Sequence, residues 1–231
     1  MASEQGAIGS RPPASSVRET EWISWLFTIG SACFAVASIP MLAAAVPDDV
    51  IGTTYFVGAL FFTTASVLVA ATTWRDIAAR ERSGSPVRAL RKSIDWWAAM
   101  IQVAGTLWFN VNTYNAMLDG LTTQEQNLRV WTPDFLGSVC FLVSSYLSWW
   151  SFCHRPWCLC RDMRAWQIAA FNLAGSLFFM AAALAAFVLP STGDALDASL
   201  ANSATLTGAL CFLIGARLLT RTDIETPGDS L

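Results

Sequence analysis

The densest set of potential metal ligands in this sequence lies in one short segment, SFCHRPWCLCRDMR, which begins at residue 151. Four of its side chains carry thiol or imidazole groups: Cys153, His154, Cys158 and Cys160. Zinc, copper and iron–sulfur clusters prefer such ligands. The segment has no CxxC pair, however, and the adjacent Cys153 and His154 cannot easily both face one ion. A metal site and a set of ordinary reduced cysteines both stay open.

A second set of polar side chains lies within the apolar stretch Trp96–Leu118. Gln102, Thr106 and Asn110 recur every four residues there, and Asn172 precedes a later glycine by three residues, as Gln102 does. Polar groups inside a membrane must find partners or line a wet cavity. These four residues are therefore either interhelical hydrogen-bonding groups or a candidate polar path for a solute or ion.

Other kinds of chemistry find little support. No Asp, Glu, Lys or Arg falls in the middle of an apolar stretch, since Asp95, Asp134 and Arg217 lie near the ends. Ion-coupled transporters normally hold such a charge within the membrane. The sequence has no Gly-rich phosphate loop and no nucleophile elbow, and its single His excludes bis-His haem ligation. We predict that the protein is not an enzyme and uses no cofactor.

The elements that position these residues are predicted to be membrane helices. The chain has 231 residues, of which 54% are hydrophobic and 13% charged, whereas soluble domains average about 25% charged residues. This composition excludes a nucleic-acid-binding protein. Six stretches are long and apolar enough to span a bilayer: Trp22–Val46, Ile51–Thr73, Trp96–Leu118, Phe135–Phe152, Ala165–Leu189 and Ser199–Thr220. Because they are continuous rather than alternating, an all-α fold with six transmembrane helices is predicted.

The positive charges predict the orientation of these helices. Of the 14 Lys and Arg, Arg129 alone falls in a loop on the side away from the N terminus. Positive charge marks the cytoplasmic side, so both termini are predicted to be cytoplasmic in a plasma (inner) membrane. The basic segment Arg75–Lys92 either enforces this topology or contacts anionic lipid.

Both ends of the chain are predicted to be tails. Residues 1–20 are rich in Ser, Ala, Pro and Gly and lack an apolar core, so they predict a disordered cytoplasmic tail rather than a signal peptide. Residues 222–231 are again polar and predict a second cytoplasmic tail. The transmembrane domain is expected to occupy residues 21–221.

One short pattern recurs in each of the six stretches: a glycine, a small residue, two further residues and a phenylalanine. Its glycine and phenylalanine pairs are Gly30 and Phe34, Gly58 and Phe62, Gly105 and Phe109, Gly137 and Phe141, Gly175 and Phe179, and Gly208 and Phe212. Lipid is as apolar as leucine, so membrane helices associate through close packing, which Gly beside a small residue permits. The Phe one turn later shares the glycine's face. We predict a helix-packing site in every helix.

The spacing of this pattern indicates three two-helix units. Short outer loops would join the stretches into antiparallel hairpins at roughly 22–73, 96–152 and 165–220. The glycines of alternate stretches recur every 70 to 79 residues. Three tandem copies of one hairpin explain this spacing better than six independent helices.

The segments FTIGSACF, FLGSVCF, NLAGSLFF and LTGALCFLIG resemble the YrhK-like family of small bacterial membrane proteins. The domain of that family is a two-helix segment built around a Gly-Ser-x-x-Phe phrase. The resemblance covers most of the chain as three units and implies a bacterial plasma-membrane protein. It supplies no catalytic residues.

These features predict a structural, accessory or partner-binding protein. Its surroundings would be the lipid bilayer, and its partner another membrane protein or a second copy of the chain. An uncoupled channel or facilitator for a small solute is the first alternative, which rests on the polar residues of Trp96–Leu118. A metal- or thiol-dependent membrane sensor is the second, which rests on the cysteines near residue 158.

Overall fold

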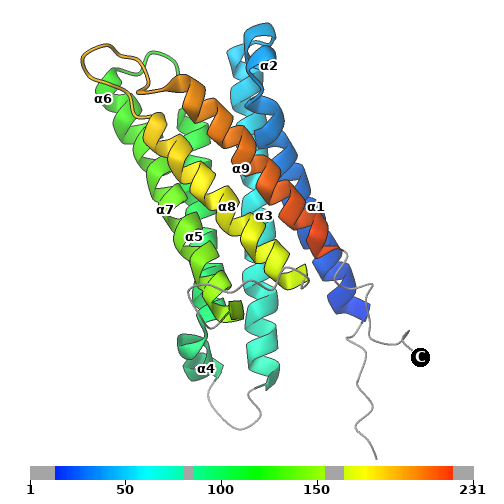
Figure 1. Ribbon diagram of the computed structural model, residues 1–231. Helices are drawn as coiled ribbons and strands as arrows, with labels where there is room; N and C mark the ends of the chain where they lie inside the picture. Colours follow the sequence, from blue (N-terminus) through cyan, green and yellow to red (C-terminus); the bar gives the residue numbers. More distant parts are fainter. Residues whose placement is uncertain (1–13, 81–85, 154–163, 221–231) are drawn as a thin grey trace, which may run out of the picture.

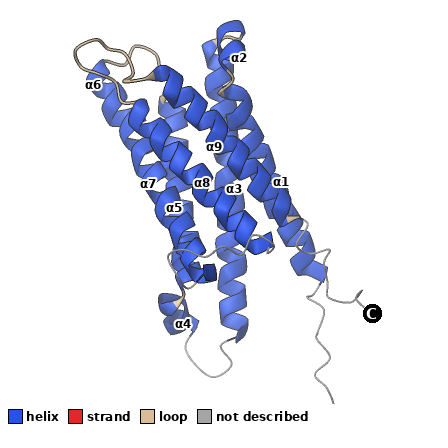
Figure 2. Ribbon diagram, in the orientation of Figure 1, coloured by secondary structure: helices blue, strands red, loops and turns tan. Residues whose placement is uncertain are grey.

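The computed structural model describes residues 14–80, 86–153 and 164–220 of the chain. Within these ranges it consists of helices and loops, with one isolated β-bridge between Val188 and Ala195 (Figure 2). The long helices are α1 (Ala14–Ala37), α3 (Asp48–Arg80), α5 (Ile94–Asn115), α7 (Thr132–Cys153), α8 (Arg164–Ala185) and α9 (Ala198–Leu219). The short ones are α2 (Pro40–Ala45), α4 (Pro86–Lys92), α6 (Thr123–Gln126) and the π-helix η1 (Asn127–Trp131).

The six long helices form one closed ring. Each packs against the next in the order α1, α3, α5, α7, α8 and α9, and α9 packs back against α1. The described part of the chain starts and ends at the same end of this bundle, the lower end in Figure 1, where α4 also lies. At the closure, Ser24 Oγ donates a 2.5 Å hydrogen bond to the Ala216 carbonyl, and the Arg217 guanidinium lies 4.6 Å from the centre of the Trp25 ring.

Four of these helices, α1, α3, α8 and α9, contain stretches long and apolar enough to cross a membrane. The helices α5 and α7 fall outside this set, although each has 22 residues. They correspond to the most polar and the shortest of the six predicted spans. The described residues therefore form an all-helical protein, and four of its helices have the length and composition to span a membrane.

Several helix boundaries differ from those expected from hydropathy. The first predicted span ran to Val46, but α1 ends at Ala37 and α2 begins at Pro40, because proline lacks the N–H that would continue the helix. Helix α1 begins at Ala14, so residues 14–20 of the predicted tail are helical. The fifth predicted span ran to Leu189, whereas α8 ends at Ala185.

Side-chain caps fix the starts of α5, α6 and α9. Ser93 Oγ accepts a hydrogen bond from the backbone N–H of Trp96 at the start of α5, and Asp197 accepts one from Leu200 at the start of α9. A capping box between Thr122 and Glu125 starts α6. Its hydrogen bonds to the Glu125 carboxylate lower the pKa of that group.

Candidate functional site

The glycines of the repeated pattern meet in three pairs: Gly30 with Gly58, Gly105 with Gly137, and Gly175 with Gly208. A methyl group added to Gly30 would lie 3.0 Å from the carbonyl oxygen of Gly58, and one on Gly58 would lie 3.1 Å from that of Gly30. In the other two pairs the corresponding distances are 3.0 to 3.2 Å. At this separation only glycine leaves enough room, so the glycines determine how closely the paired backbones approach.

The phenylalanine of each pattern covers the glycine of the paired helix. A methyl group on Gly30 would lie 3.0 Å from Cδ2 of Phe62, and one on Gly58 would lie 2.9 Å from Cδ2 of Phe34. The same exchange joins α5 to α7 and α8 to α9. Each contact is therefore reciprocal.

The small residue after each glycine has an exposed fraction of 0%, and these residues are Ser31, Ala59, Thr106, Ser138, Ser176 and Ala209. Between α7 and α8 their role is visible. Ser138 Oγ donates to the Phe179 carbonyl at 3.4 Å, and Ser176 Oγ donates to the Phe141 carbonyl at 3.2 Å. At this interface the residue after the glycine faces the neighbour that the glycine does not touch.

The six phenylalanines fill the centre of the ring and are called the phenylalanine core below: Phe34, Phe62, Phe109, Phe141, Phe179 and Phe212. Those of α1, α5 and α8 form one triangle with ring centroids 5.8 to 6.2 Å apart. Those of α3, α7 and α9 form a second triangle, at 5.9 to 6.3 Å. Distances of 5.1 to 5.7 Å join the triangles. The core thus closes the middle of the bundle.

A cavity of about 550 Å³, the outer cavity, lies on one side of the core. Its lining includes the first phenylalanine triangle, of which Phe34 is a member, together with Tyr55, Trp131, Asn112 and Asp134. Asn112 Nδ2 donates a 3.0 Å hydrogen bond to Oδ1 of Asp134. The cavity combines aromatic rings with one hydrogen-bonded carboxylate.

Asp134 lies one residue before the predicted span Phe135–Phe152, in the first turn of α7. The residue as a whole is half-buried, and desolvation by the surrounding protein raises the pKa of its carboxyl group to about 7. From the sequence alone, Asp134 lies near a helix end, where an interfacial location makes a charged group less costly. No local signal distinguishes such a position from a cavity wall, because helices distant in the sequence, among them α1, α3, α5, α8 and α9, supply the rest of the wall.

The π-helix η1 covers part of the outer cavity, and Trp131 at its end lines the wall. Trp131 Nε1 donates to the Ala183 carbonyl at 2.8 Å, and its ring stacks on Phe135 with centroids 5.3 Å apart. At the other end of η1, the Asn127 side chain exchanges two hydrogen bonds with the backbone of Val188. Short π-helical segments often occur at functional sites.

A second cavity of about 300 Å³, the inner cavity, lies on the other side of the core and is bounded by Phe62 and Phe212. Gln102 and Asn172 both line it. Gln102 Oε1 accepts a 2.9 Å hydrogen bond from Ser144 Oγ. Two of the four predicted path residues therefore come together here.

The other two predicted path residues lie within helix interfaces. Thr106 is fully buried and bonds to the Val103 carbonyl at 2.8 Å. Asn110 Nδ2 donates to Thr63 Oγ1 at 2.8 Å, which joins α5 to α3, while the Asn110 side-chain oxygen has no hydrogen-bond partner among the described residues. The Thr106 bond stays within α5, whereas the Asn110 bond is an interhelical bond of the kind expected of buried polar groups in a bilayer.

Most of the predicted metal site lies outside the described residues. Cys153 is the last residue of α7, whereas His154, Cys158 and Cys160 belong to residues 154–163. Cys33 in α1, Cys140 in α7 and Cys211 in α9 are free cysteines. In the described part of the chain, no group of three or more His, Cys, Asp or Glu is arranged to hold a metal ion.

In comparisons with known proteins, no protein-family model, curated protein or solved structure matches this chain. The geometry alone therefore defines the candidate site. It comprises the phenylalanine core, the outer cavity above it and the inner cavity below it.

Proposed function

We propose that the protein is a six-span membrane protein of the plasma membrane with a structural, accessory or partner-binding role. In this proposal its spans form three antiparallel YrhK-like hairpins, and both termini are cytoplasmic. The observation that carries the role is the phenylalanine core, because its two triangles occupy the axis along which a solute would pass. A closed bundle with a cavity at each end suits binding better than conduction.

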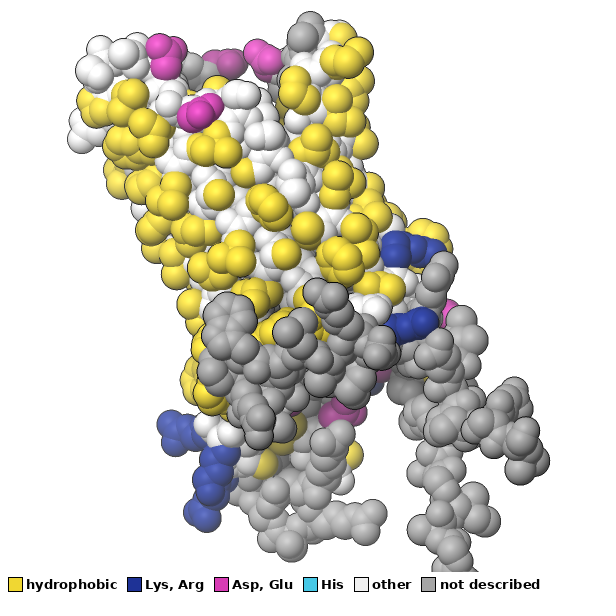
Figure 3. All heavy atoms as spheres, in the orientation of Figure 1, with side chains coloured by type: hydrophobic (Ala, Val, Ile, Leu, Met, Phe, Trp, Pro, Cys, Tyr) yellow, Lys and Arg dark blue, Asp and Glu magenta, His cyan; other side chains and the backbone are white. Residues whose placement is uncertain are grey.

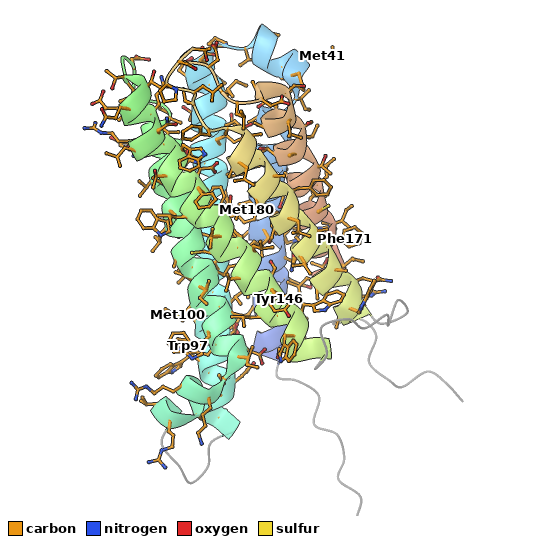
Figure 4. All side chains as sticks on the ribbon, turned by 60° about the vertical axis from the view of Figure 1, so that its left-hand side comes forward. Met41, Trp97, Met100, Tyr146, Phe171 and Met180 are labelled. Carbon is orange, nitrogen blue, oxygen red and sulfur yellow. The ribbon has the colours of Figure 1, made fainter. Side chains whose placement is uncertain are left out.

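The surface supports six spans rather than four. On α5 the exposed side chains include Trp97, Met100 and Trp108, and Tyr146 is exposed on α7. Figure 4 shows Trp97 and Met100 directed away from the bundle. Large apolar side chains on the outer faces of α5 and α7 suit contact with lipid, as they do on the four more apolar helices.

The charges on the visible face support the proposed orientation. Lys and Arg gather at the lower end of the molecule, several acidic side chains lie at the upper end, and hydrophobic side chains cover the middle (Figure 3). The lower end holds α4, with Arg91 and Lys92 in its last turn. Positive charge at this end matches a cytoplasmic location.

Cysteine labelling in intact cells tests the number of spans. Gln124→Cys in α6, Thr192→Cys between α8 and α9, and Arg88→Cys in α4 place thiols at exposed positions. A membrane-impermeant maleimide should label the first two, and should label the third only after permeabilisation. If Thr192→Cys is labelled but Gln124→Cys is protected, α5 and α7 do not cross and the protein has four spans.

An uncoupled facilitator is the second candidate, because the two cavities approach the phenylalanine core from opposite ends. Purified protein in lipid vesicles tests it with small neutral solutes such as urea and glycerol. The proposed binding role predicts the same permeability as in empty vesicles. A saturable increase in permeability would favour the facilitator instead.

A further inference from the structure

The outer cavity has the size of a ligand site. Its volume of about 550 Å³ falls within the range of roughly 300 to 1,000 Å³ that is typical of small-molecule pockets. The phenylalanine core closes its base, and Tyr55 and Trp131 contribute aromatic walls. A pocket with this lining suits an organic molecule with an apolar body.

The charges of the cavity determine which molecules fit. Asp134 and Asp119 are its acidic lining residues, and none of the described residues that line it is Lys, Arg or His. The hydrogen bond from Asn112 reaches one oxygen of the Asp134 carboxylate, but an amide does not neutralise the charge. A buried carboxylate is stabilised best by a cation, and the described residues supply no such cation at this site.

The aromatic lining narrows the choice of cation. Aromatic rings attract positive charge through their faces, and organic ammonium groups are the ligands that exploit this interaction most often. A hard metal ion such as Ca²⁺ takes six or more oxygen ligands, commonly with several carboxylates among them, and among the described residues no group of three or more His, Cys, Asp or Glu is arranged to hold a metal ion. An anion would face two carboxylates.

We propose that the outer cavity binds a small organic ammonium ion, with its charged head beside Asp134 and its apolar body against the phenylalanine core. The position of Asp134 in the first turn of α7 places the carboxylate in the wall of the cavity, and Asn112 orients it. This site needs only the ring of helices around the cavity, so it does not depend on the number of spans.

Three aromatic probes of similar size test the proposal on the purified full-length protein in detergent, at about pH 8, above the pKa of about 7 that Asp134 has. Benzylamine carries a cation, benzyl alcohol is neutral and benzoate is an anion. Isothermal titration calorimetry should show benzylammonium binding at least about tenfold more tightly than either of the others, a difference of about 1.4 kcal/mol. Equal affinities, or no binding of benzylammonium at millimolar concentration, would overturn the proposal.

The variant Asp134→Asn removes the charge but keeps the size of the side chain. It should abolish the preference for benzylammonium over benzyl alcohol. Asp194→Asn is the matched control, since this exposed residue at the same end of the bundle does not line the cavity, and it should bind like the wild type. Undiminished benzylammonium binding by folded Asp134→Asn contradicts the proposed role. If Asp134→Asn does not fold, the ranking of the three probes on the wild type still decides.

Discussion

Gly58 shows how a single missing methyl group controls the packing of two helices. Its neighbours across the interface are the backbone oxygen of Gly30 and the side chains of Cys33 and Phe34, all within 3.1 Å of where a Cβ would lie. Gly52, six residues earlier on α3, has only the side chain of Met117 within that distance. Both glycines lie on α3, but a Cβ at Gly58 would meet backbone of the neighbouring helix, whereas one at Gly52 would meet the Met117 side chain.

We expect Gly58→Ala to destabilise the protein by about 1 to 3 kcal/mol, because the added methyl group overpacks a backbone contact that cannot give way. Gly52→Ala should be neutral or slightly stabilising, since methionine is flexible and alanine is the better helix former. Thermal unfolding of both purified variants checks this. Equal loss in the two would show that the contact with Gly30 has no special role.

The Asp134 carboxyl group predicts a pH dependence of stability. Its pKa in the folded protein is about 7, above the value of about 3.9 for an unfolded chain. The folded state therefore binds more protons between these values, so stability falls as pH rises from about 4 to about 7 and is level above that. Tyr55 and Asp119 are the other titratable groups that line the same cavity.

Melting temperatures of the wild type and of Asp134→Asn, measured from about pH 4 to about pH 8, test this. The wild type should lose stability relative to the variant over that range, by at most about 1.4 kcal/mol per pH unit. Parallel curves would mean that Asp134 does not titrate with the raised pKa.

Among the elements, η1 departs most from what hydropathy predicts. The segment Asn127–Trp131 was expected to be loop, but it is a π-helix continuous with α7. Its position depends on Ala183 and Val188, which lie more than 50 residues away in the chain. Long-range hydrogen bonds of this kind leave no local pattern in the sequence, which explains why neither η1 nor the outer cavity was foreseen.

We expect Trp131→Phe to destabilise the protein by about 1 to 2 kcal/mol, because the Ala183 carbonyl loses the donor that satisfies it within the protein. The phenylalanine would keep the aromatic contact with Phe135. Trp108→Phe is the control, since that indole is exposed on the outer face of α5. Chemical unfolding of both variants should separate them, and equal stability would leave the hydrogen bond without effect.

At the scale of the whole molecule, the sequence pattern predicts a packing face on each helix but not that the six faces meet at one centre. A glycine and a phenylalanine four residues apart share a helix face by helical geometry alone. In all six long helices that face turns inward. The order of the ring, and the division of the core into two triangles, depend on which helices become neighbours. Those choices are made by contacts across the chain, so they could not be deduced from residue spacing.

We expect Phe109→Ala to cost about 3 to 5 kcal/mol, because it leaves a hole in the phenylalanine core. Phe178→Ala is the control, since that ring is exposed on α8 and should cost far less. Urea or thermal denaturation measures the difference. Both variants can also be placed in lipid vesicles to test whether the phenylalanine core blocks passage between the two cavities. Permeability to urea that appears in Phe109→Ala but not in Phe178→Ala would show that the core separates them.

The three glycine pairs have a consequence for assembly. Each helix presents one face to the other helix of its pair through glycine. At the junction of α7 and α8, the small residue after the glycine contacts the adjoining pair. A pair of helices alone would leave that second face uncovered on both sides. A separate chain with one such pair would therefore complete the same ring by trimerising, and joining three of them end to end would make the trimer independent of protein concentration.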